Sequence, residues 1–298
     1  MTSYAEFHKR SLTDRDSFWA EQAQMVDWKV QPTQICDYSN PPFAKWFVGG
    51  ITNMCHNAVD RHLTTRPDQA ALIFVSTETD QEKVYSFREL HAEVQRMAAC
   101  LKELGVQKGD RVLIYMPMIA EAAFAMLACT RIGAIHSVVF GGFASGSLAS
   151  RIEDASPKVI VSADAGSRGG KAVPYKPLLD EAIRLSSHKP DAVLMVDRGL
   201  VAMEMVAGRD HLWGTLREKN LNTVVECEWV ESTHPSYTLY TSGTTGKPKG
   251  VQRDTGGYCV ALAASMKHIY AGNPGETYFS TSDIGWVVGH SYIIYGPL

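Results

Sequence analysis

The sequence of 298 residues has few of the features that mark membrane, secreted or nucleic-acid-binding proteins. It contains no apolar run long enough to span a bilayer, and its N-terminal stretch MTSYAEFHKRSLTDRDSFWAEQ is too charged for a signal peptide. Positive charge is not in excess, because the formal net charge is −3. Overall charge therefore gives no reason to expect a nucleic acid or an anionic membrane as a partner. We expect a cytoplasmic enzyme that binds small molecules through local groups of residues.

The sequence also lacks the cysteine and histidine spacings that are typical of metal sites. No C-x-x-C pair occurs among the six cysteines, and no H-E-x-x-H is present. We therefore expect buried free thiols in a reducing compartment, rather than disulfides or metal ligands, and no metal site. The cysteines are scattered along the chain at Cys36, Cys55, Cys100, Cys129, Cys227 and Cys259.

What the sequence does contain, from about residue 70, is a regular alternation of short β-rich runs and helical periods. Apolar strands separated by helices are typical of parallel sheets covered on both faces, so the pattern predicts an α/β fold with parallel-rich sheets layered with helices. In the helix predicted over 86–105, Ser86 is the expected N-cap and Glu89 closes a capping box. Strands are predicted at 71–76, 83–86, 111–117, 135–140, 158–163, 192–197 and 237–242, and further helices at 119–134, 147–155, 176–185 and 258–270.

Both ends of the chain depart from this alternation. Residues 1–60 are rich in tryptophan and proline, and we expect them to form an N-terminal extension that packs on a main domain of residues 61–298. At the other end, the apolar run IIYGPL stops without a polar tail or a cap. This is the pattern of a chain cut inside a domain, although a buried C-terminus would give the same sequence.

A loop rich in glycine, hydroxyl groups and lysine follows the last predicted strand, in the stretch LYTSGTTGKPKGVQRD. It is not a P-loop, because the lysine of a P-loop opens a helix and Lys247 is followed by Pro248. Its glycines nevertheless allow close backbone approach to a polyphosphate, and its hydroxyls and lysines supply donors and charge. A flexible surface hairpin with solubilising lysines is the alternative. The candidate phosphate-binding residues are Thr241, Ser242, Gly243, Thr244, Thr245, Gly246, Lys247 and Lys249.

The segment YTSGTTGKPKG resembles the signature of the acyl-adenylate-forming enzymes, which include acyl-CoA synthetases, nonribosomal adenylation domains and luciferases. Two further stretches, AKWFVGGITNMCHNAVDRHL and DIGWVVGHSYIIYGPL, are similar to the N-terminal extension and the acyl and CoA pocket of the short-chain acyl-CoA synthetase branch. The resemblance implies an incomplete AMP-binding domain over residues 61–298 behind an extension of the acetyl-CoA-synthetase type. It also implies ATP, Mg²⁺, CoA and a short-chain carboxylate as ligands.

The resemblance assigns two more groups of residues. It aligns Arg168, Gly169, Gly170 and Lys171, in SRGGK, with a contact to the nucleotide phosphates of CoA, whereas the residues alone equally suit a solvated loop. It places an acyl pocket at Trp286, Val287, Val288 and His290, which could otherwise be ordinary core residues. Val288 stands where acetate-activating members usually have threonine, so we expect a more apolar pocket, as in the propionate-activating members. One methylene in such a pocket changes binding by only ~1–3 kcal/mol, so other short acids are poorer substrates, not excluded ones.

In this family a carboxylate attacks the α-phosphate of ATP, pyrophosphate leaves, and the thiol of CoA then attacks the acyl-adenylate. The residues that contact adenine and ribose, and the lysine used in adenylation, align beyond Leu298. We therefore expect an N-terminal part with little turnover alone and assign no catalytic residue within it. The alternatives are an acetyl-CoA synthetase or other short-chain synthetase, and a non-catalytic module that binds CoA or a nucleotide. Pro248 argues against a P-loop kinase.

Overall fold

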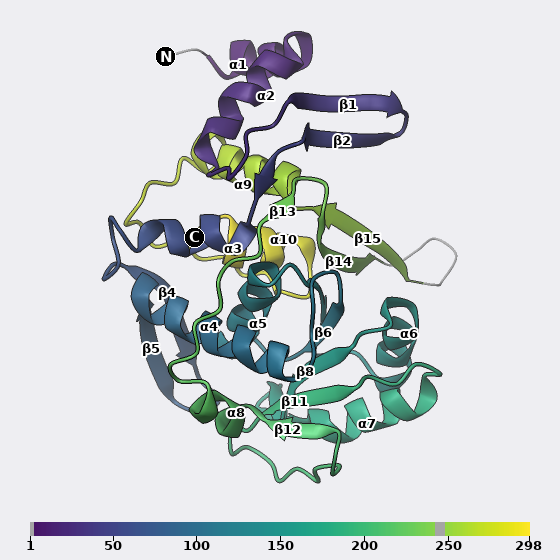
Figure 1. The fold of residues 1–298 in the computed structure, drawn as a ribbon. Coiled ribbons are helices and arrows are strands. Elements are labelled where there is room, and N and C mark those ends of the chain that lie inside the picture. The colour runs from purple at the N-terminus through teal and green to yellow at the C-terminus, as the bar shows by residue number, and fades with distance from the viewer. Residues whose placement is uncertain (1–2, 242–247) are drawn as a thin grey trace.

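The computed structural model describes residues 3–241 and 248–298 (Figure 1). Its centre is a seven-stranded sheet made of β6 (Arg111–Tyr115), β7 (Ile135–Val139), β8 (Val159–Ala163), β11 (Ala192–Val196), β12 (Asp210–Leu212), β14 (Pro235–Thr241) and β15 (Lys249–Asp254). The strand order is β12-β11-β8-β6-β7-β14-β15, and every neighbouring pair is parallel except β14 and β15. The α/β fold with a parallel-rich sheet is confirmed.

Helices connect and cover these strands, as the alternation predicts. The helices of this part of the chain are α4 (Phe87–Glu103), α5 (Ala120–Arg131), α6 (Ser145–Ala155), α7 (Tyr175–Leu185), α8 (Trp213–Lys219), α9 (Gly256–His268), α10 (Val287–Gly289) and the π-helical turn η3 (His290–Tyr295). The predicted capping box at the start of α4 is present, with the Ser86 hydroxyl accepting from Glu89 N–H and the Glu89 carboxylate accepting from Ser86 N–H. The helix is amphipathic, and its apolar face is buried.

The sheet is buried on both faces because successive residues of each strand point to opposite sides. Val112 and Ile114 of β6 join a large core with α4, α5 and α9, whereas Leu113 and Tyr115 join a second core with α6 and α7. Each of the strands β7, β8 and β11 has five residues, and all of them are buried. This double coverage explains why these strands read as continuous apolar runs rather than as alternating ones.

Within the described residues, four two-stranded sheets lie outside the main sheet. The runs near residues 71–76 and 83–86 pair with each other and not with the parallel strands. The hairpin that carries Arg168 and Lys171 projects from the end of β8. These sheets are formed by β1 (Gln34–Asn40) with β2 (Phe43–Val48), β3 (Ile51–Thr52) with β13 (Val230–Glu231), β4 (Ala70–Ser76) with β5 (Gln81–Ser86), and β9 (Ala165–Arg168) with β10 (Lys171–Pro174).

The N-terminal residues form an aromatic-rich layer that packs on α9, at the top of Figure 1. The ring of Phe7 lies 4.5 Å from that of His268, whose Nε2 is 2.9 Å from the side-chain oxygen of Gln22. Trp19 and Trp46 pack edge to face, with ring centroids 5.9 Å apart. Besides the β1–β2 hairpin, this layer contains α1 (Tyr4–Thr13), α2 (Arg15–Gln22) and η1 (Ala23–Met25). The next elements, α3 (Met54–Ala58) and η2 (Asp60–His62), lie lower in Figure 1, where α3 packs on α5 and η2 on α4.

The structure also tests two expectations about residue classes. All six cysteines are free thiols, and five of them are buried. Across 3–241 and 248–298, no helix combines the length and the apolar character that crossing a membrane requires.

Candidate functional site

The candidate site lies at the carboxyl edge of the main sheet. β7 and β8 lie on opposite sides of β6, so the direction in which successive strands are added to the sheet reverses at β6. In α/β sheets, ligands bind in the crevice outside the carboxyl ends of the strands at such a switch point. β14 runs parallel to β7, which brings its carboxyl end to the same edge. The segments that leave this edge therefore include those carrying the predicted phosphate-binding, CoA-binding and acyl-pocket residues.

The predicted phosphate loop joins the two strands at the end of the sheet. β14 ends at Thr241 and β15 begins at Lys249, and these two residues are paired across the antiparallel ladder. Both are exposed to solvent. The remaining predicted phosphate-loop residues, Ser242, Gly243, Thr244, Thr245, Gly246 and Lys247, lie outside the described residues.

Side chains from α6 contact Tyr240, near the end of the strand from which this loop departs. The hydroxyl of Tyr240 donates a hydrogen bond to the Asp154 carboxylate at 2.6 Å. The guanidinium of Arg151 lies over the rings of Phe143 and Tyr240, at 4.3 and 5.6 Å from their centroids. Burial and the neighbouring carboxylate raise the pKa of Tyr240, so the phenol remains a donor at neutral pH. Sequence reasoning missed this contact, since the helical period puts Arg151 and Asp154 on one face but gives no sign of Tyr240.

The four predicted CoA-binding residues form a tight cationic turn. Arg168 and Lys171 face each other at the end of the β9–β10 hairpin, and both side chains are exposed. The linking residues Gly169 and Gly170 have φ values of +59° and +75°. Two-residue hairpin loops with positive φ at both positions favour glycine, because a Cβ is strained there. The structure therefore brings two exposed cations together on a two-residue turn beside the carboxyl end of β8.

The predicted acyl-pocket residues divide into an exposed group and one buried residue. Trp286, Val287 and Val288 are each about half exposed. Trp286 packs against Phe140, which directly follows β7, with ring centroids 6.0 Å apart. The exposed group therefore sits at the carboxyl edge of the sheet, as an apolar surface.

His290, by contrast, points into the core and is fully buried. Its ring stacks on His136 with centroids 5.3 Å apart, and Tyr237 lies 4.7 Å away on β14. Burial lowers the pKa of His290 to about 4, so the ring is neutral at pH 7. A neutral buried imidazole behind the pocket segment suits support of that segment better than direct contact with a substrate.

Next to the pocket segment, Asp283 is a partly buried acid. Burial raises the pKa of its carboxyl group, although the backbone N–H of Gly285 donates to it at 2.6 Å. The backbone N–H of Ile284 lies 3.4 Å from the sulfur of Met118, which follows β6. These contacts fix the segment before Trp286 against the end of the central strand. A separate surface hollow of about 280 Å³ is lined by residues of β5 and α4 and contains none of the predicted site residues.

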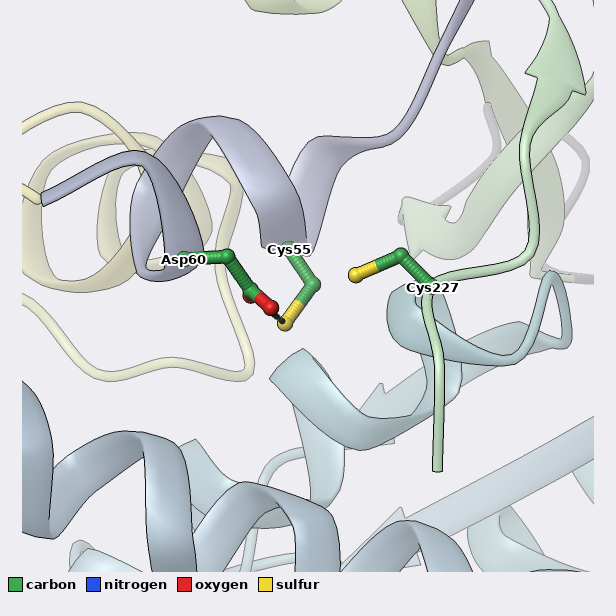
Figure 2. A group of neighbouring side chains, drawn as sticks. All are labelled: Cys55, Asp60 and Cys227. Atoms are coloured by element: carbon green, nitrogen blue, oxygen red, sulfur yellow. Dashed lines mark hydrogen bonds between the residues drawn. The ribbon is translucent and has the colours of Figure 1, made fainter. Parts of the chain in front are cut away.

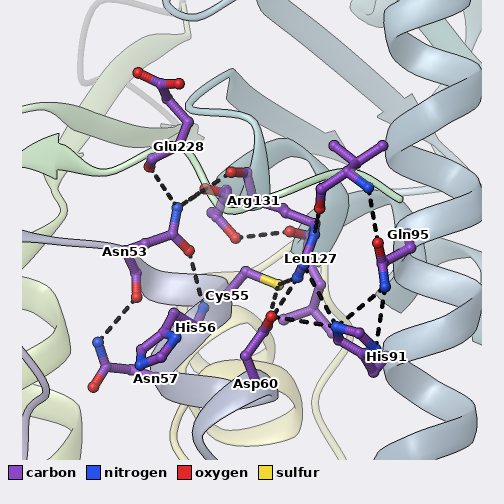
Figure 3. Close-up of polar contacts among 12 residues, drawn as sticks. Asn53, Cys55, His56, Asn57, Asp60, His91, Gln95, Leu127, Arg131 and Glu228 are labelled. Atoms are coloured by element: carbon purple, nitrogen blue, oxygen red, sulfur yellow. Dashed lines mark hydrogen bonds and ion pairs between the residues drawn. The ribbon is translucent and has the colours of Figure 1, made fainter. Parts of the chain in front are cut away.

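Away from this edge, a cluster of polar side chains that the sequence does not reveal joins the N-terminal layer to the rest of the molecule (Figure 3). The side-chain amide of Asn53 donates to the backbone carbonyls of Thr130, Arg131 and Glu228. Arg131 is 2% exposed and pairs with Asp60 at 2.8 Å. The members come from distant parts of the chain, so no local spacing signals them.

Comparisons with known proteins agree on one family for the whole chain. The profile described as "AMP-binding enzyme" matches residues 59–298, and the one described as "Acetyl-coenzyme A synthetase N-terminus" matches residues 4–58. The chain is 60% identical to "Propionate--CoA ligase" of Escherichia coli (strain K12) over 296 residues, which cover 99% of this chain and 47% of that protein. It is 61% identical to the protein of the same name in Salmonella typhimurium, with the same coverage.

A relative with another name is less similar. The chain is 49% identical to "Acetyl-coenzyme A synthetase" of Methylobacterium radiotolerans, over 99% of this chain and 46% of that protein. The chain thus spans about half the length of the curated relatives that it matches.

Proposed function

Because the chain belongs to the family of AMP-binding enzymes, we propose that the protein it represents is a propionate–CoA ligase. Such an enzyme converts propionate, CoA and ATP, supplied as its magnesium complex, into propionyl-CoA, AMP and pyrophosphate. The observation that carries the proposal is the YTSGTTGKPKG segment, which includes the residues that connect two paired strands at the carboxyl edge of the sheet. The identity of 60% to a propionate–CoA ligase supports the choice of acid.

In the proposed first step the carboxylate of propionate attacks the α-phosphate of ATP and pyrophosphate departs. Phosphoryl transfer of this kind depends on positioning and on neutralising charge more than on covalent help from the protein. Thr241 and Lys249, with Ser242 to Lys247 between them, would hold the β- and γ-phosphates. The Tyr240–Asp154 hydrogen bond supports this role, because it anchors the strand from which the loop departs.

In the proposed second step the thiol of CoA attacks the acyl-adenylate and AMP leaves. Arg168 and Lys171 would bind the nucleotide phosphates of CoA, since both cations are exposed on one turn and no carboxylate is paired with either among the ion pairs of the described residues. The three half-exposed residues Trp286, Val287 and Val288 would form one wall of the acyl pocket. His290 would support that wall from behind.

Three further assignments belong to this proposal. We place the boundary between the N-terminal extension and the AMP-binding domain at residue 60. We propose a cytoplasmic enzyme, because six free thiols suit a reducing compartment. We also propose small molecules as its partners, rather than nucleic acids or membranes.

The test is an assay of acid-dependent AMP and pyrophosphate formation by the full-length product of the gene, alongside the 298-residue chain. Propionate is expected to give a higher kcat/KM than acetate or butyrate, by about 10-fold or more. Replacing Lys247 and Lys249 together by alanine is expected to abolish adenylation, whereas Lys267→Ala, an exposed lysine at the end of α9, keeps full activity.

Two results would contradict the proposal. A preference for acetate would favour an acetyl-CoA synthetase, the alternative that the identity of 49% to such an enzyme keeps open. Binding of CoA and ATP by the full-length product without turnover of any short acid would favour a non-catalytic binding module.

A further inference from the structure

Two cysteines far apart in the sequence face each other at the junction between the N-terminal layer and the rest of the molecule (Figure 2). Cys55 lies in the first turn of α3, and Cys227 lies on the segment that leads to β13. Their Sγ atoms and a carboxylate oxygen of Asp60 all lie within 4.8 Å of one another. Such a group could bind a metal ion or form a disulfide, and its surroundings distinguish these two uses.

The guanidinium of Arg131 already contacts this group of side chains. Arg131 Nη1 lies 2.8 Å from Asp60 Oδ2 and 3.6 Å from Cys55 Sγ, and the Arg131 side chain is almost completely buried (Figure 3). Although burial opposes it, hydrogen bonding to His91 and the pairing with Arg131 hold the pKa of Asp60 well below its usual range. The carboxylate is therefore ionised and neutralised by the guanidinium. A metal ion would have to displace or face this buried positive charge.

The thiols also resist the double deprotonation that metal binding requires. Hydrogen bonding to Cys55 and burial both raise the pKa of Cys227. The pair therefore keeps at least one proton at neutral pH, whereas thiolates are the ligands of zinc. Two sulfur atoms this close, beside a guanidinium that already neutralises Asp60, suit a disulfide better than a metal site.

We propose that Cys55 and Cys227 form a modification site, at which a peroxide converts the two thiols into a disulfide that links α3 to the segment before β13. The site is distinct from the proposed nucleotide and CoA site at the carboxyl edge. The reagent that modifies it is a two-electron thiol oxidant, and hydrogen peroxide is the probe used in the experiment below.

The reaction runs in two balanced steps. Cys227, which is partly exposed, meets the peroxide first, and its thiolate takes one oxygen to give a sulfenic acid with release of water. The raised pKa of Cys227 makes this step slow, because only the small thiolate fraction attacks. The Sγ of Cys55, which is fully buried and so protected from further oxidation, attacks the sulfenic sulfur. The S–S bond forms and a second water leaves with the oxygen of the sulfenic acid and a thiol proton. The two thiols lose two electrons and the peroxide is reduced to water.

The disulfide would reinforce a junction that hydrogen bonds already hold. Asn53, two residues before Cys55, donates to the carbonyl of Glu228, which directly follows Cys227. The backbone on both sides is thus held at this junction, and the two Sγ atoms lie within 4.8 Å of each other before the bond forms. A bond between these positions closes a long loop, which stabilises the fold by restricting the unfolded chain.

The experiment treats the 298-residue chain with hydrogen peroxide, alkylates the remaining thiols, and maps disulfides by mass spectrometry after trypsin digestion. The expected product joins peptides 46–61 and 220–249, with loss of two of the six titratable thiols. The melting temperature is expected to rise by about 5 °C or more, and to return to its original value with dithiothreitol. Cys227→Ser, at the partly exposed position, should fold and show neither change, whereas Cys36→Ser, at a thiol outside the pair, should retain both.

Three outcomes would overturn the proposal. Cys55 and Cys227 could remain alkylatable after peroxide treatment that oxidises methionine, or Cys227 could stop at the sulfinic acid. The purified chain could instead carry one equivalent of zinc that Cys227→Ser releases, which would make the group a metal site. Cys227→Ala serves as a second variant, so that a folding defect of one substitution does not decide the result.

Discussion

At the residue scale, Asn53 shows how one side chain can connect distant segments. Its Oδ1 accepts the N–H of His56 as the cap of α3, while its amide N–H groups satisfy buried carbonyls. We predict that Asn53→Asp lowers the free energy of unfolding by about 2–4 kcal/mol, because the cap survives but a carboxylate faces those carbonyls. Urea denaturation measures this change. Asn273→Asp, where the amide makes only local contacts, should stay within about 0.5 kcal/mol.

The candidate site is only partly predictable at this scale. The sequence marks Arg168 and Lys171 because they flank two glycines, and the structure brings them together as that spacing suggests. It does not mark Tyr240, Asp154 or Phe140, since their contacts depend on how α6 and the sheet pack. The sequence does not distinguish His290 from the other predicted acyl-pocket residues. In the structure it lies in the core, because the helical turn after Trp286 directs its side chain inward.

At the element scale, the β9–β10 hairpin depends on two glycines with positive φ. We predict that Gly169→Val or Gly170→Val lowers the free energy of unfolding by about 1–3 kcal/mol, since a β-branched residue is strained in this region. The two variants should also weaken CoA binding, because the turn sets the spacing of the two cations. Gly146→Ala, in the first turn of α6 with open space around its Cα, is the matched control and should be neutral or stabilising. Equal losses in all three variants would show that backbone strain is not the cause.

The elements themselves were largely predictable, because their signals are local. The capping box and the apolar face of α4 specify that helix, and the buried runs of β6, β7 and β8 specify parallel strands. The partner of a strand is not a local property. The sequence predicted strands at 71–76 and 83–86 but could not show that β4 and β5 pair apart from the main sheet, or that β15 adds an antiparallel edge to it.

At the scale of the whole molecule, buried histidines set the response to acid. Burial lowers the pKa of His62 and of His290 to about 4, and that of His136 well below its ordinary value of 6.5. Each group is neutral when folded and protonated when unfolded between pH 4 and 6.5, so stability is full above pH 6.5 and falls with pH through this window. Asp254 acts oppositely, because burial raises its pKa to about 6, and Glu121 and Asp283 act in the same direction as Asp254. The pKa of His268 is also lowered by burial, so it adds to the effect of the other histidines.

We therefore predict that the urea midpoint of unfolding falls steadily from pH 7 to pH 4.5. His62→Gln should make the urea midpoint fall less steeply with decreasing pH, because one proton fewer is taken up on unfolding. Asp254→Asn should make the slope steeper, because its opposing contribution is lost while the amide oxygen can still accept from Gly257. A midpoint that is constant over this pH range would show that these histidines are protonated in the folded protein.

The strand order sets the sequence of events as the chain leaves the ribosome. β14 must find its place beside β7, although β8, β11 and β12 are synthesised between them, and closing so long a loop is entropically slow. The turn with Arg168 and Lys171 can therefore settle on a nascent chain well before the segment after Thr241 is positioned. Of the three proposed subsites, the one on this turn is therefore expected to form first, because the residues that would hold the triphosphate and the acyl group are synthesised later.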